Sequence, residues 1–83
     1  MRGNLSGMTI QTIRQASSVA DKVRGISVEK RVRQADLASA LNLSRMAVVR
    51  RLNGSVPFTD RELIALAERL DVKVGAFFGE VAA

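Results

Sequence analysis

This 83-residue sequence contains no cysteine, histidine, tryptophan or tyrosine. The absence of cysteine excludes disulfide bonds and thiolate metal sites. The absence of histidine removes the commonest general base and metal ligand. We therefore expect no catalysed reaction, no metal and no cofactor. Hydrophobic residues make up 47% of the chain, which suits one small folded domain and excludes a disordered basic tail.

Long apolar runs are also absent, because the longest is the five-residue segment Leu63–Ala67. Such a run is far too short for a membrane span or a signal sequence. We therefore expect a cytoplasmic protein that has no membrane partner and no small-molecule substrate.

Basic charge is concentrated in the first two thirds of the chain. Residues 1–54 carry ten Lys and Arg against three acids, a net charge of +7, whereas residues 55–83 carry three against five, a net charge of −2. This asymmetry favours one face that binds a polyanion, although small basic domains also use such charge for solubility alone.

The first segment of the chain lacks periodicity. Residues 1–8 include two glycines and are predicted to be a flexible arm, which leaves residues 9–83 as a single domain. From Ile10 onward, apolar residues recur at helical spacing. Two arrangements are open. Thr9 caps one long helix, or the Ser17-Ser18 pair divides the segment into two pieces and Ser18 caps the second piece.

Four further helices are predicted from apolar spacing and capping residues. They cover residues 34–41, residues 45–53, the segment that follows Thr59, and residues 73–79. Strand-like alternation is absent from the sequence. The prediction is an all-α domain of five helices, or six if the first segment is divided.

Residues with known capping preferences mark the ends of these helices. Asn42 is expected in the left-handed conformation, Ser44 as an N-cap and Gly54 just beyond a helix end. Thr59 and Glu62 have the spacing of a capping box. The helix that follows is expected to turn five apolar residues toward a core: Leu63, Ile64, Leu66, Ala67 and Leu70.

The helices at 34–41 and 45–53 are separated by only three residues, so they must cross steeply. This is the spacing of a helix-turn-helix, spanning residues 34–53, whose second helix can enter the major groove of DNA. Ala38 is small where the crossing requires close approach, and Leu43 can fill the junction between the helices.

A helical wheel divides the second helix into two sides. Val48 and Leu52 fall on the side expected to face the core. Met46, Arg50 and Asn53 fall on the opposite side, and Arg45 and Val49 flank it. The outward side therefore contains two arginines, an amide and two apolar residues. Arginine can bind guanine through two hydrogen bonds, and apolar side chains can contact thymine methyl groups. The helix also has no acid that phosphate would repel.

Two other interpretations of this helix stay open. Solvated surface charge is the alternative explanation for its arginines, and a wide apolar stripe in the core is the alternative explanation for Met46 and Val49. Residues that contact DNA phosphates should flank the helix. The candidates are Arg33, Gln34, Ser44, Arg51 and the backbone amides near Gly54 and Ser55.

Several of these segments, in this order and spacing, resemble one known family. Gln34-Ala35-Asp36-Leu37-Ala38, Leu41-Asn42-Leu43-Ser44 and Val48 to Gly54 resemble the Cro/C1-type (XRE) helix-turn-helix family of phage repressors and bacterial regulators. Leu63 to Val72 is similar to the fourth helix of that family. The resemblance covers about residues 18–79, and the segments Arg51-Leu52-Asn53-Gly54 and Val56-Pro57-Phe58-Thr59 are especially similar to repressors of actinobacteria and their phages.

The resemblance implies a compact lambda-repressor-like domain that often binds DNA as a dimer. By position in the family pattern, Gln34 would hold a phosphate, and Ser44 would cap the recognition helix and touch the backbone. Asn53 and Gly54 would end that helix near the backbone. The base-reading positions would be Arg45, Met46, Val49 and Arg50.

The sequence departs from the family pattern at three positions. Arg33 stands where a Ser or Thr cap is usual, and Asn42 replaces a usual Gly in the turn. Met46 occupies a position that is often polar, which puts direct hydrogen bonding to a base there in doubt.

We therefore expect a sequence-specific double-stranded DNA-binding regulator of the phage Cro or immunity-repressor kind, acting by operator occlusion. The small size favours a Cro-like protein, although a truncated DNA-binding domain would look the same. The oligomeric state is left open by the sequence. If the protein forms a homodimer, residues 9–17 and residues 72–81 are the two candidate contact surfaces. The alternative is an antitoxin-like protein-interaction module of the same fold, whose contact surface would be formed by four apolar residues: Met46, Val49, Phe77 and Phe78.

Overall fold

The computed structural model of the chain describes residues 18–79, whose regular elements are all helices. A helix over residues 18–29 is followed by four shorter elements: α2 (Gln34–Leu41), α3 (Arg45–Leu52), α4 (Asp60–Leu70) and the 3₁₀-helix η1 (Val74–Phe78). The all-α prediction is confirmed. Within the same residues, no helix combines the length and the apolar content needed to cross a bilayer.

The number of helices differs from the sequence prediction. The segment predicted as a helix over residues 73–79 forms only the short 3₁₀-helix η1, an element that rarely extends beyond a few residues. The predicted arm at residues 1–8 and the helix start at Thr9 lie outside the described residues. An arrangement of five or six helices is therefore not supported.

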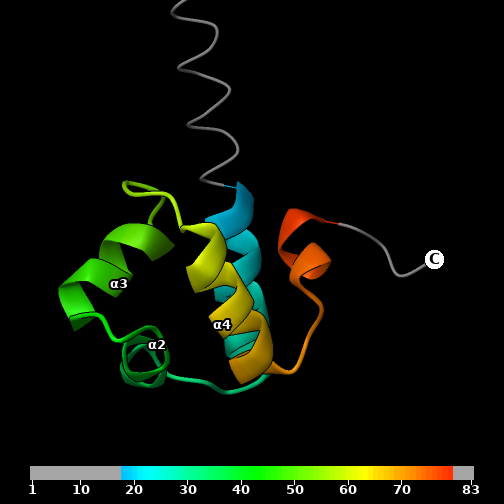
Figure 1. The fold of residues 1–83 in the computed structure, drawn as a ribbon, viewed down its shortest axis with the longest axis horizontal. Helices are drawn as coiled ribbons and strands as arrows, with labels where there is room; N and C mark the ends of the chain where they lie inside the picture. Colours follow the sequence, from blue (N-terminus) through cyan, green and yellow to red (C-terminus); the bar gives the residue numbers. More distant parts are fainter. Residues whose placement is uncertain (1–17, 80–83) are drawn as a thin grey trace, which may run out of the picture.

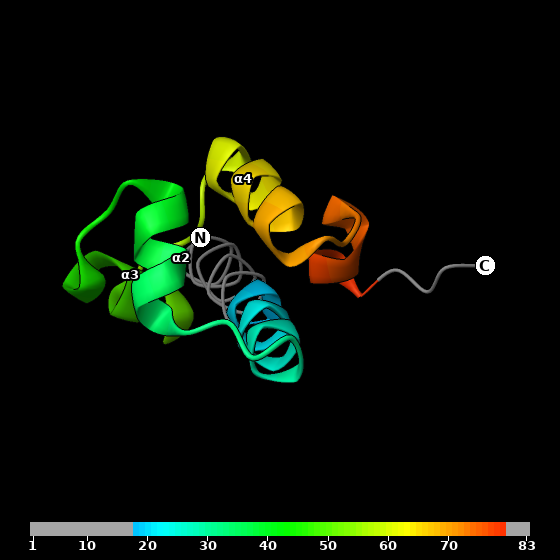
Figure 2. The same ribbon diagram turned by 90° about the horizontal axis from the view of Figure 1, so that it is seen from below.

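The helices are arranged around α4. Figures 1 and 2 show α2 and α3 on one side of α4 and η1 on the other. α2 packs against both α3 and α4, and η1 packs against α4. As a result, α3 lies at an outer edge of the molecule, with one side turned toward α2 and the core.

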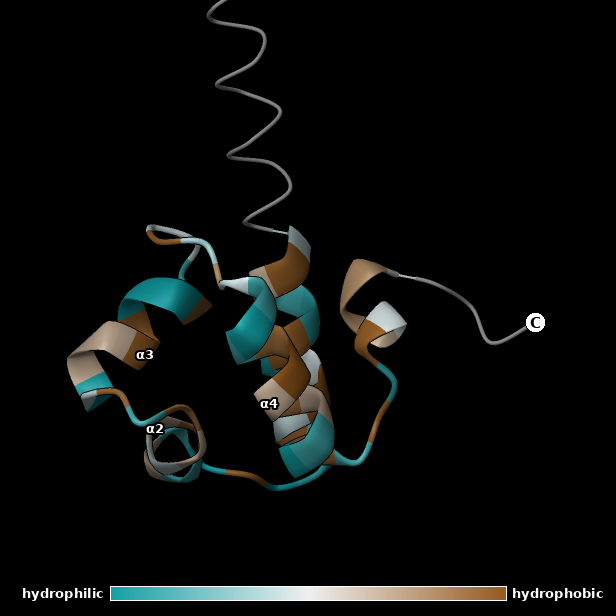
Figure 3. Ribbon diagram, in the orientation of Figure 1, coloured by the Kyte–Doolittle hydropathy of each residue, from teal (hydrophilic) through white to brown (hydrophobic). Residues whose placement is uncertain are grey.

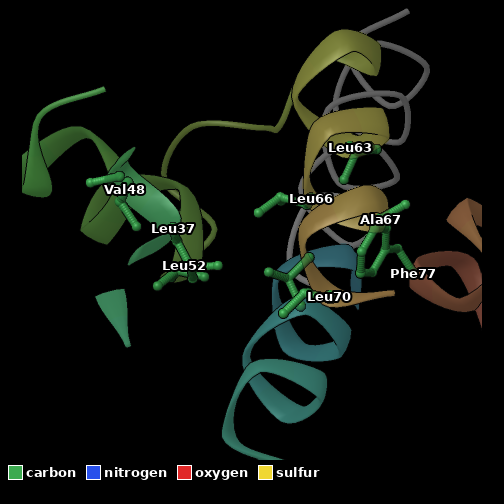
Figure 4. Packing of buried hydrophobic residues seen from close by; sticks show 10 residues of the cluster. Leu37, Val48, Leu52, Leu63, Leu66, Ala67, Leu70 and Phe77 are labelled. Carbon is green, nitrogen blue, oxygen red and sulfur yellow. The ribbon is translucent and has the colours of Figure 1, made fainter. Parts of the chain in front are cut away.

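Each helix contributes one apolar side to a shared core. Val23 of the first helix, Leu66 of α4 and Phe77 of η1 are wholly buried, and in Figure 4 the ring of Phe77 lies beside Ala67 and Leu70. Leu63, Leu66, Ala67 and Leu70 are buried as predicted, but Ile64 is 55% exposed. The prediction for Ile64 is wrong because its position on α4 lies beyond the side that the other helices cover.

Three helices end in the same way, at a residue other than glycine in the left-handed conformation. Arg31, Asn42 and Asp71 have φ of 58°, 55° and 56°, so the prediction for Asn42 is confirmed. In each case the next backbone N–H donates back to a helix carbonyl, as from Leu43 to Ala38 at 2.9 Å. These bonds satisfy carbonyl groups that would otherwise lack partners and set the direction of the chain into the next element.

α4 begins with the predicted capping box. Thr59 Oγ1 accepts from the Glu62 backbone N–H at 3.1 Å, and Glu62 Oε1 accepts from the Thr59 N–H at 3.0 Å. Phe58 and Leu63 pack in the same core cluster, as a hydrophobic staple requires. The start of α4 is therefore fixed locally, which matters because α3 contacts it.

Candidate nucleic-acid interface

The beginning of α3 is fixed by Ser44. The Ser44 backbone is extended, with φ of −69° and ψ of 158°, and its Oγ accepts from the Ala47 N–H at 3.1 Å. This confirms Ser44 as the N-cap. Because Ser44 is exposed and its hydroxyl accepts in this bond, the hydroxyl hydrogen can still donate outward.

The two sides of α3 differ in exposure as the helical wheel predicts. Val48 is wholly buried and Leu52 is nearly so, while Met46 is 61% exposed. Arg45 and Arg50 are exposed and Val49 is half-buried. The burial of Met46 in a wide apolar core stripe is therefore excluded. Figure 3 shows hydrophilic colour at the start of α3 and again toward its end.

The exposed side of α3 is electropositive. The first turn contains no acid, and the last turn contains Arg50 and Arg51. Within residues 18–79, the ion pairs join Arg24 to Asp21 and Arg51 to Glu62. Arg45 and Arg50 take part in neither pair, so their guanidinium groups keep their full donor capacity for an anion or a base edge.

Arg33 and Gln34 stand together, exposed, at the start of α2. The family pattern has a hydroxyl cap at position 33, and a guanidinium has no acceptor with which to replace it. Instead, the Asp36 carboxylate accepts from the Arg33 backbone N–H at 3.1 Å. This bond is the reciprocal half of a capping box, so the hydroxyl cap itself is not replaced, and the Arg33 side chain is left at the surface.

The turn after α3 corrects one expectation. Gly54 adopts φ of 83°, a conformation suited to glycine. The Gly54 N–H donates to the Arg51 carbonyl at 3.2 Å, and the Ser55 N–H donates to the Arg50 carbonyl at 3.0 Å and to Asn53 Oδ1 at 2.9 Å. These backbone amides are therefore occupied within the protein and are not open to phosphate. The exposed groups that remain here are the side chains of Asn53 and Ser55.

Arg51 is placed differently from the other predicted contact residues. Its Nε donates to Glu62 Oε1 at 2.9 Å, and its Nη1 donates to the Ala47 carbonyl at 3.2 Å. Its side chain is only 16% exposed. The structure therefore brings Arg51 to α4 and separates it from the solvent-facing side of α3.

Sequence reasoning missed two residues that hold α3. Glu62 was identified only as a capping residue, although a carboxylate has acceptor sites for more than one donor. Arg24 of the first helix donates to the Leu52 carbonyl and to the Asp21 carboxylate. It thereby satisfies one of the last carbonyls of α3, a contact between residues 28 positions apart that no local pattern indicates.

The chain matches a known protein family. A family model described as helix-turn-helix matches residues 28–77. This range contains α2, α3, α4 and most of η1, which is the part of the molecule that holds the candidate interface. Neither the curated proteins nor the solved structures contain a significant match.

Proposed function

This chain belongs to the XRE-type helix-turn-helix family, and we propose that it is a sequence-specific regulator that represses transcription by occluding an operator. Membership in the family indicates a transcription regulator that binds double-stranded DNA. The proposal adds the mode of action of a phage Cro protein or immunity repressor, in which the bound protein blocks polymerase or a competing regulator. It includes no catalysed reaction.

The proposal is carried by the exposed side of α3. Met46 and Arg50 are open to solvent on the side opposite the buried Val48 and Leu52, and they are flanked by the exposed Arg45 and the half-buried Val49. An α-helix fits the major groove with such a side turned to the bases. We assign Arg50 and Arg45 to guanine, and Met46 and Val49 to apolar contact with thymine methyl groups.

Contacts to the DNA backbone are proposed on either side of this helix. Arg33 and Gln34 are exposed at the start of α2, and Ser44 is exposed at the start of α3. At the far end, Asn53 and Ser55 offer side chains only. Such contacts orient the protein on the duplex without selecting a sequence, and the net charge of +7 over residues 1–54 supports a strong dependence on salt.

The proposal includes binding as a homodimer. Three large apolar side chains of α4 and η1 remain exposed: Ile64 at 55%, Val74 at 41% and Phe78 at 59%. They lie on elements other than α2 and α3, so a second copy can cover them while α3 contacts DNA. A two-fold dimer of this kind matches an operator with two half-sites about one helical turn apart.

The test is selection of bound duplexes from a random pool. We expect enrichment of an inverted repeat with half-sites spaced by roughly one helical turn. A single asymmetric motif would contradict the dimer but not the sequence-specific binding. Failure to enrich any sequence would contradict the proposed function. Binding that barely falls between low and high salt would favour the protein-interaction module instead.

A salt titration of Arg33→Ala adds a second check. Because Arg33 is proposed to contact phosphate only, its removal should weaken binding to selected and unrelated duplexes by the same factor. The slope of log K against log salt should fall by about one. Selective loss of binding to the selected duplex would move Arg33 from backbone contact to base readout.

A further inference from the structure

Arg51 uses two donors of one guanidinium, one to bind α4 and one to bind its own helix α3. Nε donates to Glu62 Oε1 at 2.9 Å, and Nη1 donates to the Ala47 carbonyl one turn earlier in α3 at 3.2 Å. The Ala47 bond orients the guanidinium along its own helix, while the Glu62 bond ties it to the neighbouring one. Both side chains are largely shielded, at 16% and 14% exposure, so solvent screens this pair less than a surface ion pair.

Glu62 is in turn held in place by the capping box of α4. The same Oε1 that accepts from Arg51 also accepts from the Thr59 N–H at 3.0 Å. The carboxylate therefore has a defined position at the start of α4, and through it Arg51 has one too. This makes the pair a fixed point between two helices and not a mobile surface contact.

Arg51 directly follows Arg50 in α3. Base readout by a side chain requires its orientation to be held within about 10–20°, and α3 has only eight residues. α3 packs through two buried residues, Val48 and Leu52, and accepts one bond from Arg24 at the Leu52 carbonyl, so few contacts fix its rotation about its own axis. The Arg51–Glu62 bond lies to one side of these buried residues and restrains the rotation.

We infer that Arg51 and Glu62 form a positioning pair, which orients the base-reading side of α3 and thereby determines sequence discrimination, and that Arg51 does not bind phosphate. This inference rests on the proposed function. It assigns opposite roles to two adjacent arginines, because Arg50 contacts the DNA and Arg51 holds the helix that carries Arg50.

Glu62→Gln distinguishes a positioning role of Arg51 from a phosphate-binding role, because the two roles predict different changes in DNA binding. Glutamine can still serve in a capping box, so α4 should begin at the same residue, but the charge that holds Arg51 is removed. For a positioning pair, we expect the ratio of affinities for the selected and an unrelated duplex to fall roughly tenfold, with the salt slope unchanged. If Arg51 instead binds phosphate once released, both duplexes should bind more tightly and the slope should steepen by about one.

Glu68→Gln is the matched control for charge. Glu68 is an exposed residue of the same helix, so this substitution makes the same change in net charge and in long-range attraction. It should leave discrimination at the wild-type value. Equal effects of Glu62→Gln and Glu68→Gln would overturn the inference, because both would then act through net charge alone.

Arg51→Lys tests the same pair from the other helix. Lysine keeps the charge but lacks the rigid fork that reaches Glu62 and Ala47 together. We expect a loss of discrimination similar to that of Glu62→Gln, while Arg61→Lys, at an exposed position of α4, should have no effect. Full discrimination in Arg51→Lys would overturn the inference. Urea unfolding of each variant identifies any loss that comes from unfolding.

The outcomes also separate this inference from the proposed function. If the wild-type protein enriches no duplex, the proposed function is wrong and the inference falls with it. If the wild type selects a sequence and the Glu62 and Arg51 variants discriminate as it does, only the inference is wrong.

Discussion

α3 and α4 begin in the same way and then differ. Each follows a hydroxyl N-cap, Ser44 or Thr59, that accepts a backbone N–H at 3.1 Å. α4 adds the reciprocal Glu62 bond, acids in its first turn, Arg69 in its last turn and four buried residues. α3 has no acid in its first turn and buries only two residues.

The difference indicates how a helix can remain suited to DNA. Acids near the start of α3 would favour the helix dipole but would repel phosphate, so α3 lacks that source of stability. Short helices depend on tertiary packing for most of their stability. Here the neighbours supply it, because Glu62 binds Arg51 and Arg24 binds the Leu52 carbonyl.

The largest expected effect comes from removing a buried side chain of α4. Leu66 is wholly buried, so Leu66→Ala should lower the free energy of unfolding by about 2–5 kcal/mol through lost contacts and a cavity. Urea unfolding followed by circular dichroism measures this. A loss below about 1 kcal/mol would mean that α4 is not the central packing element.

Arg50→Ala should have the next largest effect, on binding instead of folding. Loss of a bidentate guanine contact should cost roughly 1–3 kcal/mol of binding free energy and relax preference at one or two base pairs. The free energy of unfolding should stay unchanged because Arg50 is exposed. Titrations against single base-pair variants of the selected duplex measure both quantities. Unchanged affinity and preference would show that α3 is not the recognition helix.

Removing either N-cap should lower stability by the same amount, but the two substitutions should differ in their effect on DNA binding. Ser44→Ala and Thr59→Ala should each lower the free energy of unfolding by about 1 kcal/mol. Only Ser44→Ala should also weaken DNA binding at conditions where both variants are folded, because Ser44 lies at the candidate interface, whereas the backbone N–H of residue 59, which binds the Glu62 carboxylate, is kept in Thr59→Ala. Equal binding losses would assign both effects to helix stability alone.

The smallest expected effect is that of Met46→Ala on stability. Met46 is 61% exposed, so the free energy of unfolding should change by no more than about 0.5 kcal/mol. Selection with this variant should nonetheless change the preferred base at the position that Met46 contacts. A destabilisation of several kcal/mol would contradict the division of α3 into a buried and an exposed side.

Local features of the fold were predictable from the sequence. The bounds of α2, the left-handed Asn42, the Ser44 cap and the Thr59–Glu62 capping box all agree with the structure. Each depends on hydrogen bonds and backbone preferences that act over four residues or fewer. The helical wheel also predicted the buried side of α3 correctly, because Val48 and Leu52 are strongly apolar and lie one turn apart on the same side.

Features that depend on distant segments were not predictable. Ile64 was expected in the core because apolar spacing gives the direction of a stripe but not its covered width. The bond of Arg51 to Glu62, eleven residues later, was not foreseen because nothing near Arg51 in sequence indicates it. The amides of Gly54 and Ser55 were expected to be free, yet the turn that follows α3 uses them to close the helix.

The sequence by itself determined that the domain is helical, where α2 ends, where α3 and α4 begin, and that α3 carries a basic and partly apolar outer side. These properties follow from periodicity, capping and charge, which are local. Only the tertiary structure decided which arginines are free, because a long flexible side chain binds whichever acceptor the packing brings within reach. Arg45 and Arg50 remain open to a ligand, whereas Arg24 and Arg51 are used to hold the helix in place.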